Sequence, residues 1–160
     1  MLHATESETD LANMWHAVAM NGFSLMIHGG AGAVHAPERF EASLRRVIEA
    51  GANLLKGGAS ALDAVTHCVA LLEDDPLYNA GHGSVLNVDG AVFCDASIMD
   101  GETLDAGAIA SVRGVRNPVL LARAVMEKSE HAFLIGEGAE TFAREHGIPF
   151  EDIGYFVTEA

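Results

Sequence analysis

The fold of this chain is decided by residues 71–87, which read Leu71-Leu72-Glu73-Asp74-Asp75-Pro76-Leu77-Tyr78-Asn79-Ala80-Gly81-His82-Gly83-Ser84-Val85-Leu86-Asn87. An apolar helical run ends here at acidic residues and Pro76, and a strand-like run follows Gly81 and Gly83. Proline fixes φ and glycine accepts positive φ, so the backbone of the turn is rigid at Pro76 and can adopt left-handed conformations at Gly81 and Gly83. We predict that it holds the amide of Asn79 in place and supports a site that carries no nucleophile of its own.

The composition limits the class of protein. A chain of 160 residues fits one domain with a core of its own. Hydrophobic residues reach 49% and charged residues only 20%, which is apolar for a free-standing domain and suggests that a partner covers part of the surface. The 23 acidic residues outnumber the 9 basic ones, giving a net charge of -14 that weighs against nucleic acid and acidic membrane surfaces as partners.

The termini and cysteines indicate a cellular location. The N-terminus lacks a basic segment followed by an apolar one, and no apolar run approaches the roughly 18 residues that span a bilayer. Cys68 lies in a helical pattern and Cys94 in a strand pattern, without paired spacing, which predicts buried thiols in a reducing compartment. The sequence leaves a disulfide between them open. We expect a cytoplasmic protein that does not contact a membrane.

Before the turn, the pattern predicts one strand and two helices. Residues 1–22 form an N-terminal extension, flexible or a short surface helix, because nothing later in the chain requires them. Residues 23–28 have the composition of a buried strand, and a glycine loop follows at 29–32. Residues 37–56 predict a helix that begins at Pro37, and Ser60 followed by Asp63 resembles a capping box that starts the second helix.

After the turn, the pattern predicts an antiparallel meander. Residues 84–88 and 91–99 flank Asp89-Gly90, a hairpin signal, and residues 106–112 form the next strand. A helix starts at Asn117-Pro118, a short strand follows at 132–135, and a last helix covers 138–146. Helices outside an antiparallel sheet make an α+β fold, and so few strands leave one sheet face open unless another sheet covers it.

Several common catalytic and cofactor motifs are absent from the sequence. The glycines at 30 and 32, and at 81 and 83, fail the dinucleotide-binding spacing, and neither lysine follows a glycine as a phosphate loop requires. The serine elbow fails at Leu62, where a glycine is needed, and Ser60 is better explained as a helix cap. The eight histidines show no zinc-binding spacing. We therefore expect no organic cofactor.

Five segments resemble the α-subunit of plant-type L-asparaginase, also called isoaspartyl peptidase: His28-Gly29-Gly30-Ala31-Gly32, Gly58-Ala59-Ser60-Ala61-Leu62-Asp63-Ala64-Val65, Asn79-Ala80-Gly81-His82-Gly83-Ser84, Asp95-Ala96-Ser97-Ile98-Met99-Asp100-Gly101 and Arg116-Asn117-Pro118-Val119. The resemblance runs from about residue 24 to residue 149, in order. That family belongs to the N-terminal nucleophile (Ntn) hydrolases. The resemblance implies a four-layer αββα sandwich, in which residues 23–150 supply the α-subunit half and residues 151–160 begin a variable linker.

The resemblance also implies an activity and a partner. Family members release L-aspartate from L-asparagine or from β-aspartyl (isoaspartyl) dipeptides, and they assemble as (αβ)2 after autoproteolysis of one precursor. Their nucleophile is the first threonine of the β-subunit, whose α-amine acts as the general base. None of the threonines of this chain stands in that context; they are Thr5, Thr9, Thr66, Thr103, Thr141 and Thr158. We expect the nucleophile on a separate β-subunit and a small amide or dipeptide as the substrate.

The residues that carry over have supporting roles. By resemblance, Asn79 orients the nucleophilic threonine, and Gly29 and Gly30 lie beside the bond that is cut in the precursor. The family also binds a sodium ion through main-chain oxygens, a ligand type that hard cations favour. Those oxygens correspond here to Leu72, Glu73, Asp75, Tyr78, Ala80 and His82.

The sequence departs from the family pattern at both ends, and two alternative functions stay open. Residues 1–22 extend beyond the usual start of the family, and the chain stops at Ala160 before the family's cleavage site, as a trimmed linker or a truncated product would. A glycosylasparaginase or a threonine endopeptidase shares the Met99-Asp100-Gly101 region, although the Asn79 turn favours the asparaginase branch. The rival from another class is a non-catalytic half-domain that acts as a binding module, with an acidic surface that keeps it in solution.

Overall fold

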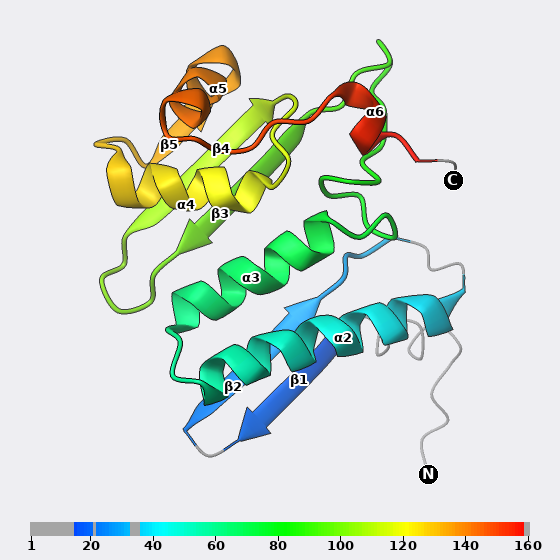
Figure 1. Cartoon of the computed structure of the whole chain (residues 1–160), viewed down its shortest axis with the longest axis vertical. Coiled ribbons are helices and arrows are strands. Elements are labelled where there is room, and N and C mark those ends of the chain that lie inside the picture. Colours follow the sequence, from blue (N-terminus) through cyan, green and yellow to red (C-terminus); the bar gives the residue numbers. More distant parts are fainter. Residues whose placement is uncertain (1–14, 21, 33–35, 159–160) are drawn as a thin grey trace. The chain divides into compact units, whose positions relative to one another are not determined.

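A computed structural model describes residues 15–20, 22–32 and 36–158 of the chain, with residues 15–20 described by their backbone (Figure 1). Helices and strands are mixed, which confirms the predicted α+β class. The chain forms two compact units, residues 1–68 and residues 69–160, and each is described here by itself. Helix α3 (Ala61–Glu73) runs across the boundary between the two.

The first unit is a two-stranded hairpin with a long helix packed on it. Strand β1 (Trp15–Met20) pairs antiparallel with β2 (Phe23–His28), and helix α2 (Pro37–Lys56) contacts both. Alternate residues Leu25 and Ile27 of β2 are buried, as expected for a strand with one covered face. Gly51 of α2 is needed at this contact, because a Cβ there would lie 2.7 Å from Leu25 Cδ2 on β2.

The sequence analysis missed strand β1. It placed residues 1–22 in a flexible extension or a surface helix, whereas residues 15–20 form a strand whose register sets Met20 opposite Phe23. Gly22 has a φ of 102°, which gives the hairpin connection the left-handed backbone that it needs. Residues 1–14 lie outside the described part, so the prediction for them stays a prediction.

The second unit contains a three-stranded sheet in the order β3-β4-β5. Strand β3 (Cys94–Met99) pairs antiparallel with β4 (Ala106–Val112), and β4 pairs in parallel with β5 (Phe133–Ile135). The helices of this unit besides α3 are α4 (Pro118–Lys128), α5 (Gly136–Glu145) and the short α6 (Ile153–Phe156).

The predicted hairpin and meander are wrong in one part. Residues 84–88 form no strand, and β3 begins at Cys94. The turn at Asp89-Gly90 exists, with Gly90 at a φ of 73°, but side-chain amides take the backbone donors that a strand ladder would use. Asn87 Oδ1 accepts from the N–H groups of Asp89 and Ala91, and the N–H of Val85 donates to Asn79 Oδ1.

The other predicted elements are confirmed. The bounds of β2, α2 and β4 match the prediction, and α4 begins at Pro118 as expected. The predicted capping box is present, because the N–H of Asp63 donates to Ser60 Oγ at 3.0 Å and Ser60 Oγ donates to Asp63 Oδ2 at 2.7 Å. The short strand and last helix are β5 and α5, shifted by one or two residues.

One face of the three-stranded sheet is covered by helix α4, and the other is bare among the described residues. Ile98, Ile109 and Val112 are buried, and helix α4 contacts both β3 and β4. The opposite face carries large apolar side chains that are about half exposed: Phe93 45%, Met99 56%, Phe133 56% and Ile135 60%. We call this set of four the bare sheet face. It fits the prediction that so few strands leave one face open.

Two further findings concern the helices and the cysteines. No described helix combines the length and the apolar character that crossing a bilayer requires. Cys68 and Cys94 are both free and buried, so the disulfide that the sequence left open is not formed.

Gly107 on β4 provides a test of how closely α4 packs on the sheet. A Cβ at Gly107 would lie 2.1 Å from the carbonyl oxygen of Ala122 and 2.5 Å from the backbone nitrogen of Met126. We predict that Gly107→Ala lowers the free energy of unfolding by about 1–3 kcal/mol, since rigid backbone must move. Urea unfolding measures it, with Gly138→Ala as the control, because a Cβ at Gly138 in α5 meets open space. Equal stability of the two variants would contradict this packing.

Candidate functional site

Residues 74–83 form the tight connection that follows α3, and we call them the asparagine turn. Gly81 and Gly83 have φ values of 56° and 99°, in the left-handed region. A Cβ at Gly81 would lie 2.5 Å from the carbonyl oxygen of Glu73, and one at Gly83 would lie 2.7 Å from that of Pro76. Both positions therefore require glycine for space as well as for conformation, which confirms their predicted role.

Backbone hydrogen bonds close the asparagine turn on itself. The N–H of His82 donates to the carbonyl of Glu73 at 2.7 Å, so the end of the turn returns to its beginning. Inside it, the N–H of Tyr78 donates to the carbonyl of Asp75, and Asp75 Oδ1 accepts from the N–H of Leu77 at 3.1 Å. The turn is thus a closed loop with its own internal bonding rather than an open connection.

Asn79 lies at the exposed surface of this loop with a defined partner. Its Oδ1 accepts a hydrogen bond from the N–H of Val85 at 3.0 Å. This bond fixes the oxygen end of the amide, and the Nδ2 end carries two donors for a ligand or partner group. The role of Asn79 in catalysis stays a prediction at this point.

A cavity of about 260 Å³ lies beside Asn79. Its lining combines parts of the asparagine turn, the segment after it, β3 and the start of α4. The lining residues are Glu73, Asn79, Ala80, Gly81, Ser84, Val85, Phe93, Cys94, Asp95 and Pro118. The cavity therefore lies between the asparagine turn and strand β3.

The cavity contains two groups of nucleophilic type, and neither is activated. Burial raises the pKa of the Cys94 thiol, and this outweighs the opposing hydrogen bonds from Ser84 and Gly81. Ser84 Oγ lies 3.7 Å from Cys94 Sγ and is itself buried. No histidine lines the cavity to serve as a base for either group. That the scaffold holds no nucleophile of its own stays a prediction.

Glu73 contributes a buried carboxyl group to the cavity. Its Oε1 accepts the N–H of Val119 in the first turn of α4 at 2.9 Å, while Oε2 is buried and has no hydrogen bond to the described residues. Burial raises the pKa of Glu73 to about 8; hydrogen bonds from Val119 and Asn117 oppose this, and the Asp74 carboxylate adds to it. Burial thus favours the neutral form of the carboxyl group, which joins the end of α3 to the start of α4.

Sequence reasoning assigned no role to the side chains of Asp95 and Glu73, which both line the cavity. Asp95 lies at an irregularity in the β3–β4 pairing, where its Oδ1 accepts from the N–H of Ser111 at 2.7 Å. Ser111 has a φ of 55°, an uncommon backbone for a residue with a side chain. A single acidic residue in the apolar run Val92-Phe93-Cys94-Asp95-Ala96 was the available signal.

The predicted glycine loop belongs to the first unit. Gly29 and Gly30 follow β2 directly, and Gly30 has a φ of 109°. The N–H of Gly30 donates to His28 Nδ1 at 3.1 Å, which ties the loop to the end of its strand. This requires the Nδ1 atom of His28 to be unprotonated.

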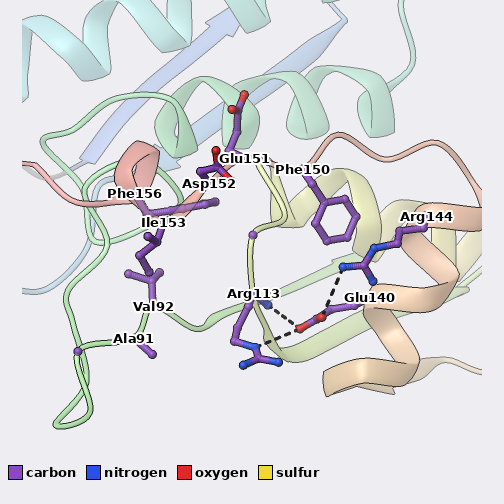
Figure 2. A pocket seen from close by; sticks show the side chains of 12 residues that line it. Ala91, Val92, Arg113, Glu140, Arg144, Phe150, Glu151, Asp152, Ile153 and Phe156 are labelled. Carbon is purple, nitrogen blue, oxygen red and sulfur yellow. Dashed lines mark hydrogen bonds and ion pairs between the residues drawn. The ribbon is translucent and has the colours of Figure 1, made fainter.

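A second cavity, of about 800 Å³, lies between β4, α5 and the C-terminal segment (Figure 2). Figure 2 shows Glu140 between Arg113 and Arg144. The buried Glu140 carboxylate accepts the N–H of Arg113 at 3.1 Å and pairs with the guanidinium groups of Arg113 and Arg144 at 3.5 and 3.8 Å. These interactions hold α5 to the end of β4, and the single charge of Glu140 balances one of the two arginine charges.

Comparison with known proteins gives a consistent family. The asparaginase family matches residues 21–160 of this chain. The chain is 50% identical over 138 residues to the isoaspartyl peptidase/L-asparaginase of Rattus norvegicus, an alignment that covers 84% of this chain and 41% of that protein. It is 54% identical over 132 residues to the plant-type L-asparaginase of Pyrococcus furiosus, covering 81% of this chain and 43% of that protein.

A bacterial relative agrees with these two. The chain is 48% identical over 148 residues to the isoaspartyl peptidase of Salmonella typhimurium, covering 88% of this chain and 47% of that protein. The chain therefore spans less than half the length of the relatives that it matches. The aligned part includes the asparagine turn, and the remainder of each relative has no counterpart in these 160 residues.

Proposed function

This chain belongs to the asparaginase family, and from that premise we propose that it is the α-subunit half of a threonine-nucleophile amidohydrolase. The proposed reaction releases L-aspartate from L-asparagine or from β-aspartyl (isoaspartyl) dipeptides. The observation that carries the proposal is the cavity beside Asn79, which has a held amide but no activated nucleophile. A half-site of this kind needs the reactive group from another polypeptide.

The proposed chemistry uses a covalent intermediate. The hydroxyl oxygen of an N-terminal threonine on the β-subunit bonds to the substrate carbonyl carbon, and its proton passes through the α-amine to the leaving nitrogen. The carbon–nitrogen bond breaks, so ammonia or an amino acid leaves and an acyl-threonine ester remains. Water then hydrolyses the ester, which frees aspartate and restores the hydroxyl group.

In this scheme the chain supplies orientation rather than proton transfer. The Nδ2 end of Asn79 donates a hydrogen bond to the threonine and so directs its hydroxyl group, an arrangement that needs no titration. Gly29 and Gly30 offer backbone close to the bond that autoproteolysis cuts. The positive φ of Gly30 fits a backbone that other groups approach closely.

The bare sheet face supports the proposed partner. In an αββα sandwich a second sheet packs about 10 Å above the first and covers such a face. The exposed Phe93, Met99, Phe133 and Ile135 present the apolar side chains that sheet packing requires. We propose that the β-subunit completes this sandwich and that two such pairs form (αβ)2.

A sodium ion in the asparagine turn is the second part of the proposal. The ligands proposed from the family resemblance are main-chain oxygens, and the described residues contain no cluster of three His, Cys, Asp or Glu side chains suited to a metal ion. The proposed oxygens are those of Leu72, Glu73, Asp75, Tyr78, Ala80 and His82. Leu72 and Glu73 lie at the end of α3 and the other four residues in the asparagine turn, and closure of the turn by the bond from His82 to Glu73 keeps the two segments together. The carbonyls of Leu72, Glu73 and Asp75 each already accept one backbone hydrogen bond, so an ion would take their second lone pair.

The proposed location is the cytoplasm, which the two free buried thiols support.

The experiment that tests the function measures ammonia and aspartate release by the complete protein, together with intact masses of its polypeptides. We expect release of aspartate and a companion polypeptide that begins with threonine. Binding of another protein by this chain, with no release and no such companion, would instead favour the binding module.

Asn79→Ala tests the orienting role. We predict that kcat for a β-aspartyl dipeptide falls about 100-fold, as for loss of one preorganised donor, with little change in the melting temperature. Asn53→Ala is the matched control, because Asn53 is exposed in α2 and lies in the other unit. Unchanged turnover in Asn79→Ala would reject the assignment.

Exchange of sodium for choline at constant ionic strength tests the ion site. A ligand that binds only the folded protein stabilises it, so we predict a melting temperature lower by about 2–8 °C, a shift of the size that roughly 1 kcal/mol produces. Calorimetry of the complete protein measures it. Identical melting in the two salts would show that the turn is held without sodium.

A further inference from the structure

Residues 149–156 return from the end of α5 to the asparagine turn, and we call them the C-terminal clasp. Their first part is fixed along residues 114–116. The N–H of Arg116 donates to the carbonyl of Pro149 at 3.0 Å, and the N–H of Glu151 donates to the carbonyl of Gly114 at 2.8 Å. Figure 2 shows Phe150 beside Arg144, whose guanidinium lies 4.4 Å from the ring centre.

The second part of the clasp binds the asparagine turn directly. The N–H of Gly83 donates to the carbonyl of Phe156 at 3.0 Å. The Nδ1–H of His82 donates to the carbonyl of Tyr155, since a carbonyl can only accept. The Phe156 side chain is 1% exposed and anchors this end of the clasp by burial. Two consecutive residues of the turn are therefore held by two consecutive residues of the clasp.

The Tyr155 side chain connects the two ends of the turn. Its hydroxyl donates to Asp74 Oδ1 at 2.9 Å, and its ring lies 4.8 Å from the ring of His82. A carboxylate oxygen can only accept, so the Tyr155 hydroxyl is the donor in this bond. Asp74 begins the asparagine turn and His82 nearly ends it.

Arg116 strengthens the same contact. Its Nε donates to Asp74 Oδ1 at 3.3 Å and its Nη1 to Glu151 Oε1 at 3.1 Å, while the guanidinium lies 5.2 Å from the Tyr155 ring centre. Arg116 thus links the first residue of the turn to the clasp by charge-assisted bonds. The asparagine turn is tied to the clasp at Asp74, His82 and Gly83.

We propose that the C-terminal clasp holds Asn79 in its working position and that Tyr155 is a positioning residue for the reaction proposed above, on which this inference rests. The link to Asn79 is short. Asn79 Oδ1 is held by the N–H of Val85, two residues after Gly83, which the clasp fixes through Phe156. If the clasp loosens, Gly83 and Val85 move relative to Asn79, and the amide loses its orientation.

The test compares variants of the complete protein, in which this chain is assembled with the remaining polypeptide. Tyr155→Phe removes the bond to Asp74 but keeps the ring, and Tyr155→Leu removes both. Val157→Ala is the control, because Val157 lies just beyond the clasp and is 43% exposed. Steady-state kinetics with a β-aspartyl dipeptide and hydrogen–deuterium exchange of a peptide spanning residues 79–87 are the two measurements.

We expect Tyr155→Phe to lower kcat about 3- to 10-fold, the effect of one lost hydrogen bond of ordinary strength, with KM within about twofold. Tyr155→Leu lowers kcat further, and both variants exchange faster over residues 79–87. The control matches the wild type in both measurements. If Tyr155→Leu fails to fold, Tyr155→Phe alone decides the question.

Wild-type exchange over residues 79–87 in Tyr155→Phe, or an unchanged kcat, would overturn the inference. A loss of melting temperature without a change in kcat would mean that the clasp is only structural, and would overturn it as well. Failure of the proposed function is distinguishable, because the wild type would then release no aspartate, whereas the exchange rates would still report whether the clasp holds the turn.

Discussion

The absence of a side chain at two positions is the constraint on which the second unit depends. Gly81 and Gly83 allow the asparagine turn to fold against the carbonyls of Glu73 and Pro76, where any Cβ would collide with backbone. Every feature near Asn79 follows from this close approach. The bond between His82 and Glu73 closes the turn, and the segment after Gly83 returns far enough for Val85 to meet Asn79.

The closed turn is connected to the rest of its unit by few but well-placed polar groups. Glu73 reaches the first turn of α4 through the N–H of Val119, and helix α4 covers β3 and β4. The clasp connects the opposite side of the turn to residues 114–116. A loop that is exposed at Asn79 is thereby held on both sides, which is how an amide without a charge keeps one orientation.

Sequence patterns predicted the elements that rest on local rules. Strand β2 and helix α2 have clear periodicity, Pro37 and Asn117-Pro118 indicate helix starts, and the capping box at Ser60 is present. The role of Gly81 and Gly83 was predicted because glycine accepts the positive φ values that tight turns require. Roles of individual residues came from the family resemblance rather than from these patterns.

The parts that were missed depend on contacts between distant residues. Residues 84–88 have the composition of a strand, but the side-chain oxygens of Asn79 and Asn87 accept hydrogen bonds from backbone N–H groups in and after this segment. A local sequence pattern does not show which acceptor a backbone N–H group will bond to. Strand β1 is short and its Asn21-Gly22 connection was assigned to an extension, although that dipeptide is a strong hairpin signal. Asp95 and Tyr155 became visible only when the fold brought them to the cavity and the turn.

The bare sheet face has a consequence for how copies of this chain behave toward one another. Four large apolar side chains are exposed on one surface. The β3 edge of the same sheet pairs with no further strand among the described residues. Both features favour association between copies of the chain. The net charge of -14 opposes this, because equally charged copies repel one another while an uncharged or basic complement does not. The acidity of the chain thus works against self-association through this surface.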